Sequence, residues 1–139
     1  MKKRIILFSC LFLACLALTA APGGARESDA PVSAADLISG KPQQAPIAGM
    51  VTMVDIGAHS CIPCKMMTPI IEALSKEYEG RAAIVFIDVW EHREEAAKYG
   101  VRTIPTQIFY DGRGVERYRH VGFLDRESIV AKLAELGVR

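Results

Sequence analysis

Two cysteines separated by two residues, Cys61 and Cys64, carry the clearest chemistry in this sequence. An apolar run from Met50 to Ile56 leads into the pair, and a helical pattern of apolar residues begins directly after it. This order predicts that Cys61 lies on the first turn of a helix, where unpaired backbone N–H groups and the positive end of the helix dipole stabilise a thiolate. Cys64 follows one turn later on the same side, close enough to form a disulfide. The pair is therefore typical of a redox switch.

Other uses of the cysteine pair fit the sequence less well. As a structural crosslink it would close a very short loop, which removes little entropy from the unfolded chain. A zinc site would need further ligands, and the sequence has no second Cys pair or His-x-His pairing. A soft metal such as Cu(I) is compatible with two thiolates, so a copper-binding module remains the alternative from another class. For the redox function we expect no metal and no cofactor.

The first 20 residues have the three parts of a secretory signal peptide. Basic residues at 2–4 precede an apolar stretch at 5–18, and small residues follow at 19–21. We predict cleavage after Ala20, which places the mature protein in the periplasm or another space outside the cytoplasm. A retained membrane anchor and lipidation at Cys15 are the alternatives.

Cleavage would also change the cysteine content of the mature chain. Cys10 and Cys15 lie inside the predicted signal, so Cys61 and Cys64 would remain as the only cysteines. The formal net charge of +1 shows no bias toward nucleic acid or an anionic membrane, so we expect neither as a partner.

The remaining sequence alternates between strand and helix patterns. Residues 21–49 are expected to form a tether with a short leading helix at 33–38, and residues 50–139 a folded domain. Strand patterns cover 50–56, 82–89, 106–110 and 115–120, and helix patterns cover 62–78, 91–99 and the stretch after Asp125. The apolar stripe of the helix at 62–78 comprises Met66, Met67, Ile70, Ile71, Leu74 and Tyr78. Alternating elements followed by a hairpin predict an α/β fold, with a mixed central sheet and helices on both faces.

Five separated features then carry a family resemblance. Asp55 stands shortly before the Cys pair in the first strand of the domain, and Cys61-Ile62-Pro63-Cys64-Lys65 is similar to a Cys-Gly-Pro-Cys-Lys motif. Pro69 lies inside the following helix. Two later stretches complete the pattern, Tyr99-Gly100-Val101-Arg102-Thr103-Ile104-Pro105-Thr106 and Val121-Gly122-Phe123. In this order and spacing, the sequence from about Met50 to Leu136 resembles the thioredoxin family and is expected to adopt the thioredoxin fold.

Some positions depart from the family pattern. Thioredoxins usually have tryptophans where this sequence has Gly57 and Ser60. The lysine that commonly accompanies the buried acid is replaced by an apolar residue near Ile84. The resemblance therefore supports the fold and the dithiol chemistry, whereas the substrate and the direction of electron flow stay open.

The resemblance implies roles for individual residues. Cys61 would be the attacking thiolate and Cys64 the resolving thiol, with Asp55 as a buried acid that exchanges a proton with Cys64. Substrates would lie in extended form against a cis-proline loop and the glycine turn, at Ile104, Pro105, Thr106 and Gly122. His59 is either a cation that favours the Cys61 thiolate or a solvated loop residue. Trp90, at the end of the second strand, is expected to have a packing role, with a place over the rim of the active site as the alternative.

Together these features predict a monomeric thiol–disulfide oxidoreductase that acts outside the cytoplasm. It would reduce disulfides in exported proteins, with electrons supplied by a membrane thiol-transfer protein, for example during cytochrome c maturation. Proline at position 63 is similar to the motif of the family's reductases, whereas the family's oxidases and isomerases tend to have His at that position. Oxidase or isomerase activity, which uses the same residues in the opposite direction, is the alternative within this class.

Overall fold

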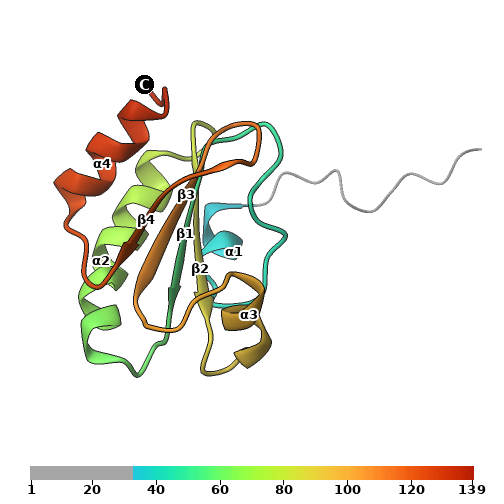
Figure 1. Ribbon diagram of the computed structural model, residues 1–139. Helices are drawn as coiled ribbons and strands as arrows, with labels where there is room; N and C mark the ends of the chain where they lie inside the picture. Colours follow the sequence, from blue (N-terminus) through green and yellow to red (C-terminus); the bar gives the residue numbers. More distant parts are fainter. Residues whose placement is uncertain (1–32) are drawn as a thin grey trace, which may run out of the picture. The chain divides into compact units, whose positions relative to one another are not determined.

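The computed structural model describes residues 33–139, which contain four helices and four strands (Figure 1). The elements are α1 (Ala34–Leu37), β1 (Thr52–Gly57), α2 (Ile62–Glu77), β2 (Ala83–Asp88), α3 (Arg93–Lys98), β3 (Thr106–Tyr110), β4 (Glu116–Val121) and α4 (Arg126–Glu135). The predicted signal peptide and the first part of the tether lie outside the described residues. Within 33–139, no helix has the length and apolar character needed to cross a membrane.

The four strands form one mixed sheet in the order β2-β1-β3-β4. β1 runs parallel to β2, since α2 carries the chain back across the sheet between them, and antiparallel to β3. β3 and β4 form an antiparallel hairpin, in whose turn the Asp111 carboxylate accepts the backbone N–H groups of Arg113 and Val115. The thioredoxin fold expected from the sequence is confirmed.

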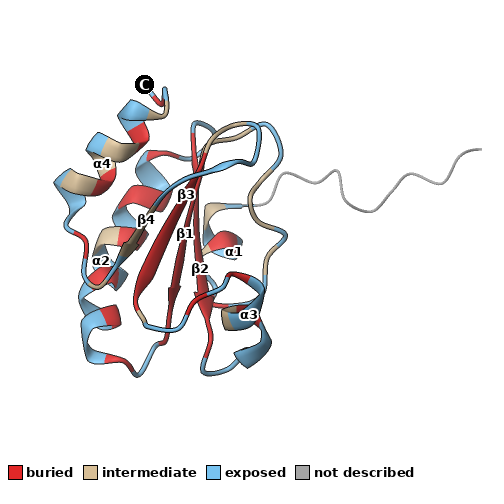
Figure 2. Cartoon of the chain, viewed as in Figure 1, coloured by how far each residue is buried: buried red, intermediate tan, exposed pale blue. Residues whose placement is uncertain are grey.

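Helices cover both faces of the sheet, so the three strands β2, β1 and β3 are buried along their whole length (Figure 2). One face packs against α2 and α4, through side chains that include Met67, Leu74, Ile129 and Leu133. The other face packs against α1 and the segment around α3, including Leu37 and Tyr99. Successive side chains of β1 alternate between these two cores.

Helix α2 begins at the cysteine motif and runs on through Pro69. Met67, Ile71, Leu74 and Tyr78 form its buried stripe, as predicted. The sequence pattern also predicts Met66 in this stripe, but Met66 is 55% exposed. The reason is geometric: one residue turns an α-helix by about 100°, so Met66 cannot share the line that Met67 and Ile71 follow.

The leading segment packs on the domain. Leu37 of α1 lies in the core, and the Ser75 hydroxyl of α2 donates a hydrogen bond to the Ala34 carbonyl at 3.1 Å. Gly40 then pairs with Ile87 in an isolated parallel bridge. The compact unit therefore begins upstream of Met50, the start that the sequence pattern predicts for the domain.

Asp55 lies in the middle of β1 and is fully buried, with 0% of its surface exposed. In register with it stand Phe86 of β2 on one side and Gln107 of β3 on the other. Phe86, two residues after Ile84 on β2, is therefore the apolar residue in register with the acid. Burial raises the pKa of Asp55 from 3.8 to about 7, and a hydrogen bond from Gln107 opposes part of this rise.

We expect Asp55→Asn to stabilise the oxidised protein in a pH-dependent way. Because folding raises the pKa of Asp55, the stabilisation from its protonation is complete below the unfolded pKa of 3.8 and is lost as pH rises through about 7. The variant should match the wild type near pH 4 and exceed it by about 2–4 kcal/mol in unfolding free energy at pH 8, at roughly 1.4 kcal/mol for each pKa unit.

Urea unfolding across this pH range measures the difference. Glu72→Gln, on the exposed face of α2, is the matched control and should change stability little at any pH. An Asp55→Asn variant that is less stable than the wild type at pH 8 would contradict the expectation.

Candidate active site

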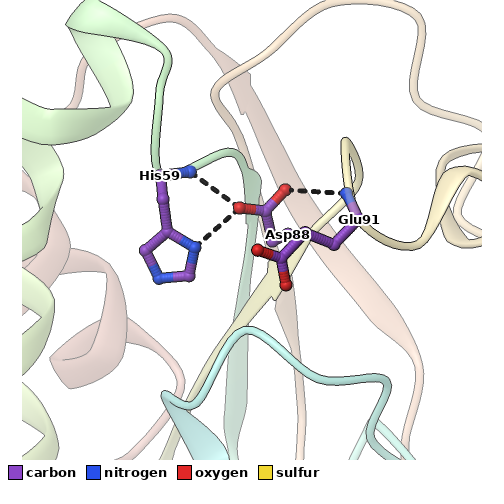
Figure 3. A group of neighbouring side chains, drawn as sticks. All are labelled: His59, Asp88 and Glu91. Atoms are coloured by element: carbon purple, nitrogen blue, oxygen red, sulfur yellow. Dashed lines mark hydrogen bonds and ion pairs between the residues drawn. The ribbon is translucent and has the colours of Figure 1, made fainter.

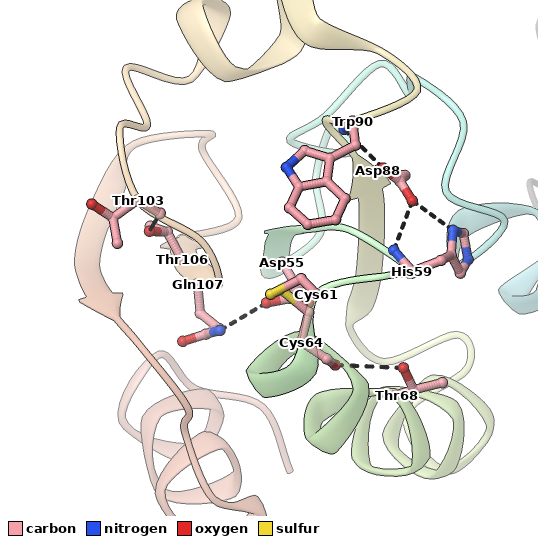
Figure 4. Close-up of a disulfide and its surroundings, with 10 residues drawn as sticks. All are labelled: Asp55, His59, Cys61, Cys64, Thr68, Asp88, Trp90, Thr103, Thr106 and Gln107. Carbon is pink, nitrogen blue, oxygen red and sulfur yellow. Dashed lines mark hydrogen bonds and ion pairs between the residues drawn. A yellow bond between two sulfur atoms is a disulfide. The ribbon is translucent and has the colours of Figure 1, made fainter.

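Cys61 and Cys64 form a disulfide at the N-terminus of α2, with their Cα atoms 5.2 Å apart (Figure 4). Cys61 is the N-cap residue and has extended backbone angles, while Cys64 lies in the first turn. In this oxidised state Cys61 is 8% and Cys64 3% exposed. The pair therefore occupies the position at a helix start that the sequence predicts, with Cys61 nearer the surface.

The loop before β3 lies against the disulfide. Ile104 packs on a small apolar cluster formed by Ala58 and the two cysteines. The peptide bond between Ile104 and Pro105 is cis, and the Pro105 carbonyl accepts the backbone N–H of Gly122 at 2.8 Å. This contact ties the proline loop to the glycine turn, so Ile104, Pro105 and Gly122 come together as the sequence predicts.

Thr106 takes a different position from these three residues. Its side chain is buried, and its hydroxyl donates a hydrogen bond to the Thr103 carbonyl at 2.6 Å. The Thr106 side chain therefore holds the loop in shape. The exposed Ile62, Pro63 and Lys65 surround the disulfide on the helix side.

Gln107 is the partner of Asp55, and the sequence analysis did not identify it. Its Nε2 donates to Asp55 Oδ1 at 2.7 Å, and Figure 4 shows the two side chains next to the disulfide. Gln107 is itself fully buried. Its polar side chain in an otherwise apolar strand pattern was the signal that could have revealed it.

The Asp55–Gln107 pair leaves two oxygen atoms unsatisfied. Within residues 33–139, Asp55 Oδ2 and Gln107 Oε1 are the buried side-chain atoms without a hydrogen-bond partner. A buried carboxylate oxygen with no donor nearby is costly when charged, and one proton would make it a neutral donor. Asp55 is thus held by one oxygen, and the other is free to take up a proton.

Phe86 fills the space beside the disulfide at the position of Gly57. A Cβ atom on Gly57 would lie 3.0 Å from the Phe86 ring and 3.4 Å from Cys64 Sγ. The edge of the His59 ring also packs on Phe86, with centroids 5.0 Å apart. The aromatic side chain at this site is therefore Phe86 of β2. In thioredoxins it is usually a tryptophan at the position of Gly57, at the end of β1.

The His59 ring is directed at Asp88, and its Nδ1 lies 2.7 Å from Asp88 Oδ2 (Figure 3). Burial favours a higher pKa for Asp88, but hydrogen bonds from the backbone of His59, Trp90 and Glu91 and from the His59 ring outweigh it and lower the pKa. An ionised carboxylate can only accept hydrogen bonds. In the contact between His59 Nδ1 and Asp88 Oδ2, the Nδ1 atom therefore carries the proton and donates it.

His59, Asp88 and Glu91 also bring three possible metal ligands within 4.8 Å of one another. However, Asp88 Oδ2 already accepts two N–H groups of His59, and Oδ1 accepts those of Trp90 and Glu91. Four donors occupy the carboxylate, so we assign this group to fixing the β1–α2 loop against the end of β2.

Trp90 follows Asp88 at the end of β2 and is 56% exposed. The packing role expected for it is therefore wrong. The two hydrogen bonds that Asp88 Oδ1 accepts shape the turn at Trp90 and Glu91, and in this turn the indole ring stands at the surface near the disulfide (Figure 4).

Comparison with known proteins agrees with this site. The family model described as Thioredoxin matches residues 44–135. Thioredoxin from Staphylococcus aureus is 45% identical over 84 residues, which cover 60% of this chain and 79% of the relative. Two solved structures are similar, each with a TM-score of 0.56. A mutant thioredoxin from Halobacterium salinarum NRC-1 is 31% identical, and the match covers 62% of this chain and 74% of that one. Fasciola hepatica thioredoxin is 32% identical, with 63% and 82% covered.

The match spans the disulfide, the buried acid and the proline loop, and it extends over more than half of the sequence. Both the family and its dithiol chemistry are therefore shown. This chain belongs to the thioredoxin family, and it is a thiol–disulfide oxidoreductase whose redox-active pair is Cys61 and Cys64.

Proposed function

We propose that this protein reduces disulfides of exported proteins outside the cytoplasm. The main support for the proposal is the position of the Cys61–Cys64 pair at a helix N-terminus. The buried Asp55 belongs to the preceding strand, and the proline loop at Ile104 packs against the pair. The basic and apolar pattern of residues 1–20 supports export.

The reaction proceeds in two exchange steps. In the first, the Cys61 thiolate attacks one sulfur of the substrate disulfide and the other substrate sulfur leaves as a thiolate. In the second, Cys64 gives up its proton and attacks Cys61 Sγ, which releases the remaining substrate thiolate and forms the Cys61–Cys64 disulfide. Two electrons pass to the substrate, and its two thiolates take up protons.

Asp55 is the proton acceptor for Cys64 in this scheme. A general base works best when its pKa is close to the working pH, and burial raises the pKa of Asp55 to about 7. One of its oxygens is held by Gln107 and the other has no partner among the described residues. The free oxygen is therefore the one that takes the proton.

The loop at Ile104 offers the binding edge for an extended substrate chain. Neither its backbone N–H nor its carbonyl is hydrogen-bonded to another residue of 33–139. A substrate segment can therefore add backbone hydrogen bonds there, next to the disulfide, with Pro105 and Gly122 beside it. The electrons would come from a membrane thiol-transfer protein, and cytochrome c maturation is one process that needs such a reductant.

A Cys64→Ser variant tests the function directly. Attack by Cys61 can still proceed, but resolution cannot, so we expect the variant to accumulate mixed disulfides with exported proteins of its cell. Non-reducing electrophoresis followed by mass spectrometry identifies the partners.

Cys61→Ser is the matched control and should trap no partner, because it lacks the attacking thiolate. Adducts confined to cytoplasmic proteins would contradict export, and their complete absence would contradict the assigned roles. The equilibrium of the Cys61–Cys64 couple with glutathione separates a reductant from an oxidase.

A Gln107→Leu variant tests the proton step. The Gln107 hydrogen bond lowers the pKa of Asp55, so its removal should raise that pKa above about 7. We expect the pH profile of the resolution step to shift upward in parallel, with a several-fold slower rate at pH 7, while Asp55→Asn should lose the inflection altogether.

NMR titration of the Asp55 carboxyl and stopped-flow rates of resolution measure the two effects. Ile108→Val changes a neighbouring buried residue of β3 on the opposite face of the sheet, and it should leave both values in place. An unchanged profile in Gln107→Leu would show that Gln107 does not tune the acid.

A further inference from the structure

A groove lies beside the proline loop, bounded by the end of β2, by α3 and by the residues before β3. Its volume is about 450 Å³. Val101 contributes to its apolar floor, and Trp90, Arg93, Arg102 and Ile104 form its walls. We call the surface formed by these five residues the arginine groove.

The arginine groove is continuous with the active site through one residue. Ile104 lines the groove and also packs on the cluster of Ala58 and the two cysteines. Trp90 stands at the surface near the disulfide (Figure 4). A substrate chain that crosses Ile104 therefore has the groove directly beside it.

The groove carries two positive charges without a counter-ion. Arg93 and Arg102 are exposed, and neither has a carboxylate within ion-pair distance among residues 33–139. Four other arginines, Arg113, Arg117, Arg119 and Arg126, each pair with an acidic side chain, and Arg81 donates to backbone carbonyls.

The acidic residues close to Arg93 in sequence do not neutralise this charge. Glu95 of α3 is buried and pairs with Lys98 at 3.0 Å. Glu94, the exposed neighbour of Arg93 on α3, does not line the groove and makes no ion pair among residues 33–139. Glu91 lies beside His59 and Asp88 and does not line the groove (Figure 3). The groove therefore presents two guanidinium groups around an apolar floor, a surface that suits carboxylate side chains on an extended chain.

We propose that the arginine groove binds an acidic segment of the substrate, with an Asp or Glu side chain close to the cysteine that Cys61 attacks. The groove thereby selects disulfides in acidic surroundings. Arg93 and Arg102 contact the carboxylates, and the exposed face of Trp90 covers the apolar parts of the same segment. This inference rests on the proposed function, because it assigns the substrate class of that site.

Reduction rates of matched peptides test the selection. Three disulfide-linked peptides of equal length differ only in two positions near the cysteine, which hold Asp, Asn or Lys. For the reduced protein at low salt, we expect the Asp peptide to react about three- to tenfold faster than the Asn peptide, and the Lys peptide to react slowest. The ratio of Asp to Asn rates should fall toward one at high salt, because screening weakens exposed charge pairs.

Two charge variants separate the groove from the general surface charge. In Arg93→Gln/Arg102→Gln we expect the ratio of Asp to Asn rates to fall close to one. Arg113→Gln/Arg117→Gln removes the same charge from the β3–β4 turn, at the opposite end of β3 from the proline loop, and should keep the wild-type ratio. Equal rates for all three peptides in the wild type, or the same ratio in both variants, would overturn the proposal.

A binding measurement distinguishes failure of the groove from failure of the reductase. Trp90 is the only tryptophan in the sequence, so its fluorescence reports peptides that enter the groove. Peptides with Ser in place of Cys cannot react, and we expect the Asp form to bind roughly threefold or more tightly than the Asn form. Tighter binding without reduction of any disulfide peptide would support the groove and contradict the reductase. Reduction without any charge preference in rate or binding would support the reductase and contradict the groove.

Discussion

Strand β1 is paired with a neighbouring strand on each edge and covered by helices on each face, and the functional site depends on this confinement. The strand ends at Gly57, and the chain turns from there into the N-terminus of α2. The position of Cys61 is therefore fixed by the most deeply buried part of the sheet. A redox pair held by a rigid, buried strand keeps its geometry better than one held by a mobile loop.

The same confinement gives the site its acid. Asp55 lies in a strand whose other positions are suited to apolar side chains, and burial there raises its pKa to about 7. Phe86 stands in register on one side, and Gln107 provides a single hydrogen bond on the other. An amide donor holds the carboxylate more weakly than a cation would, so it opposes the upward shift only in part. The core is therefore less stable than an apolar residue would make it, and the site contains a carboxyl group whose pKa lies near neutral pH.

Two charged systems flank the dithiol and act in separate ways. Asp88 is saturated by four donors and fixes the loop that carries His59, so its charge is used for structure. Arg93 and Arg102 have no such partners among residues 33–139, and their charge is available to a substrate. The two charged systems are therefore separate: one is used within the fold, and the other faces the surface beside the proline loop.

Local patterns in the sequence determined the order of the elements and placed their bounds to within two residues, because apolar periodicity, capping residues and turn glycines act over a few neighbouring residues. The same local patterns placed Cys61 and Cys64 at a helix start, and the family resemblance identified Asp55 and Pro105. Only the tertiary structure could show what lies beside these residues across the sheet. The Gln107 partner of Asp55, the Phe86 ring against Gly57 and the exposure of Trp90 all follow from strand register and from one turn held by Asp88. Such contacts join residues far apart in the chain, so no local pattern encodes them.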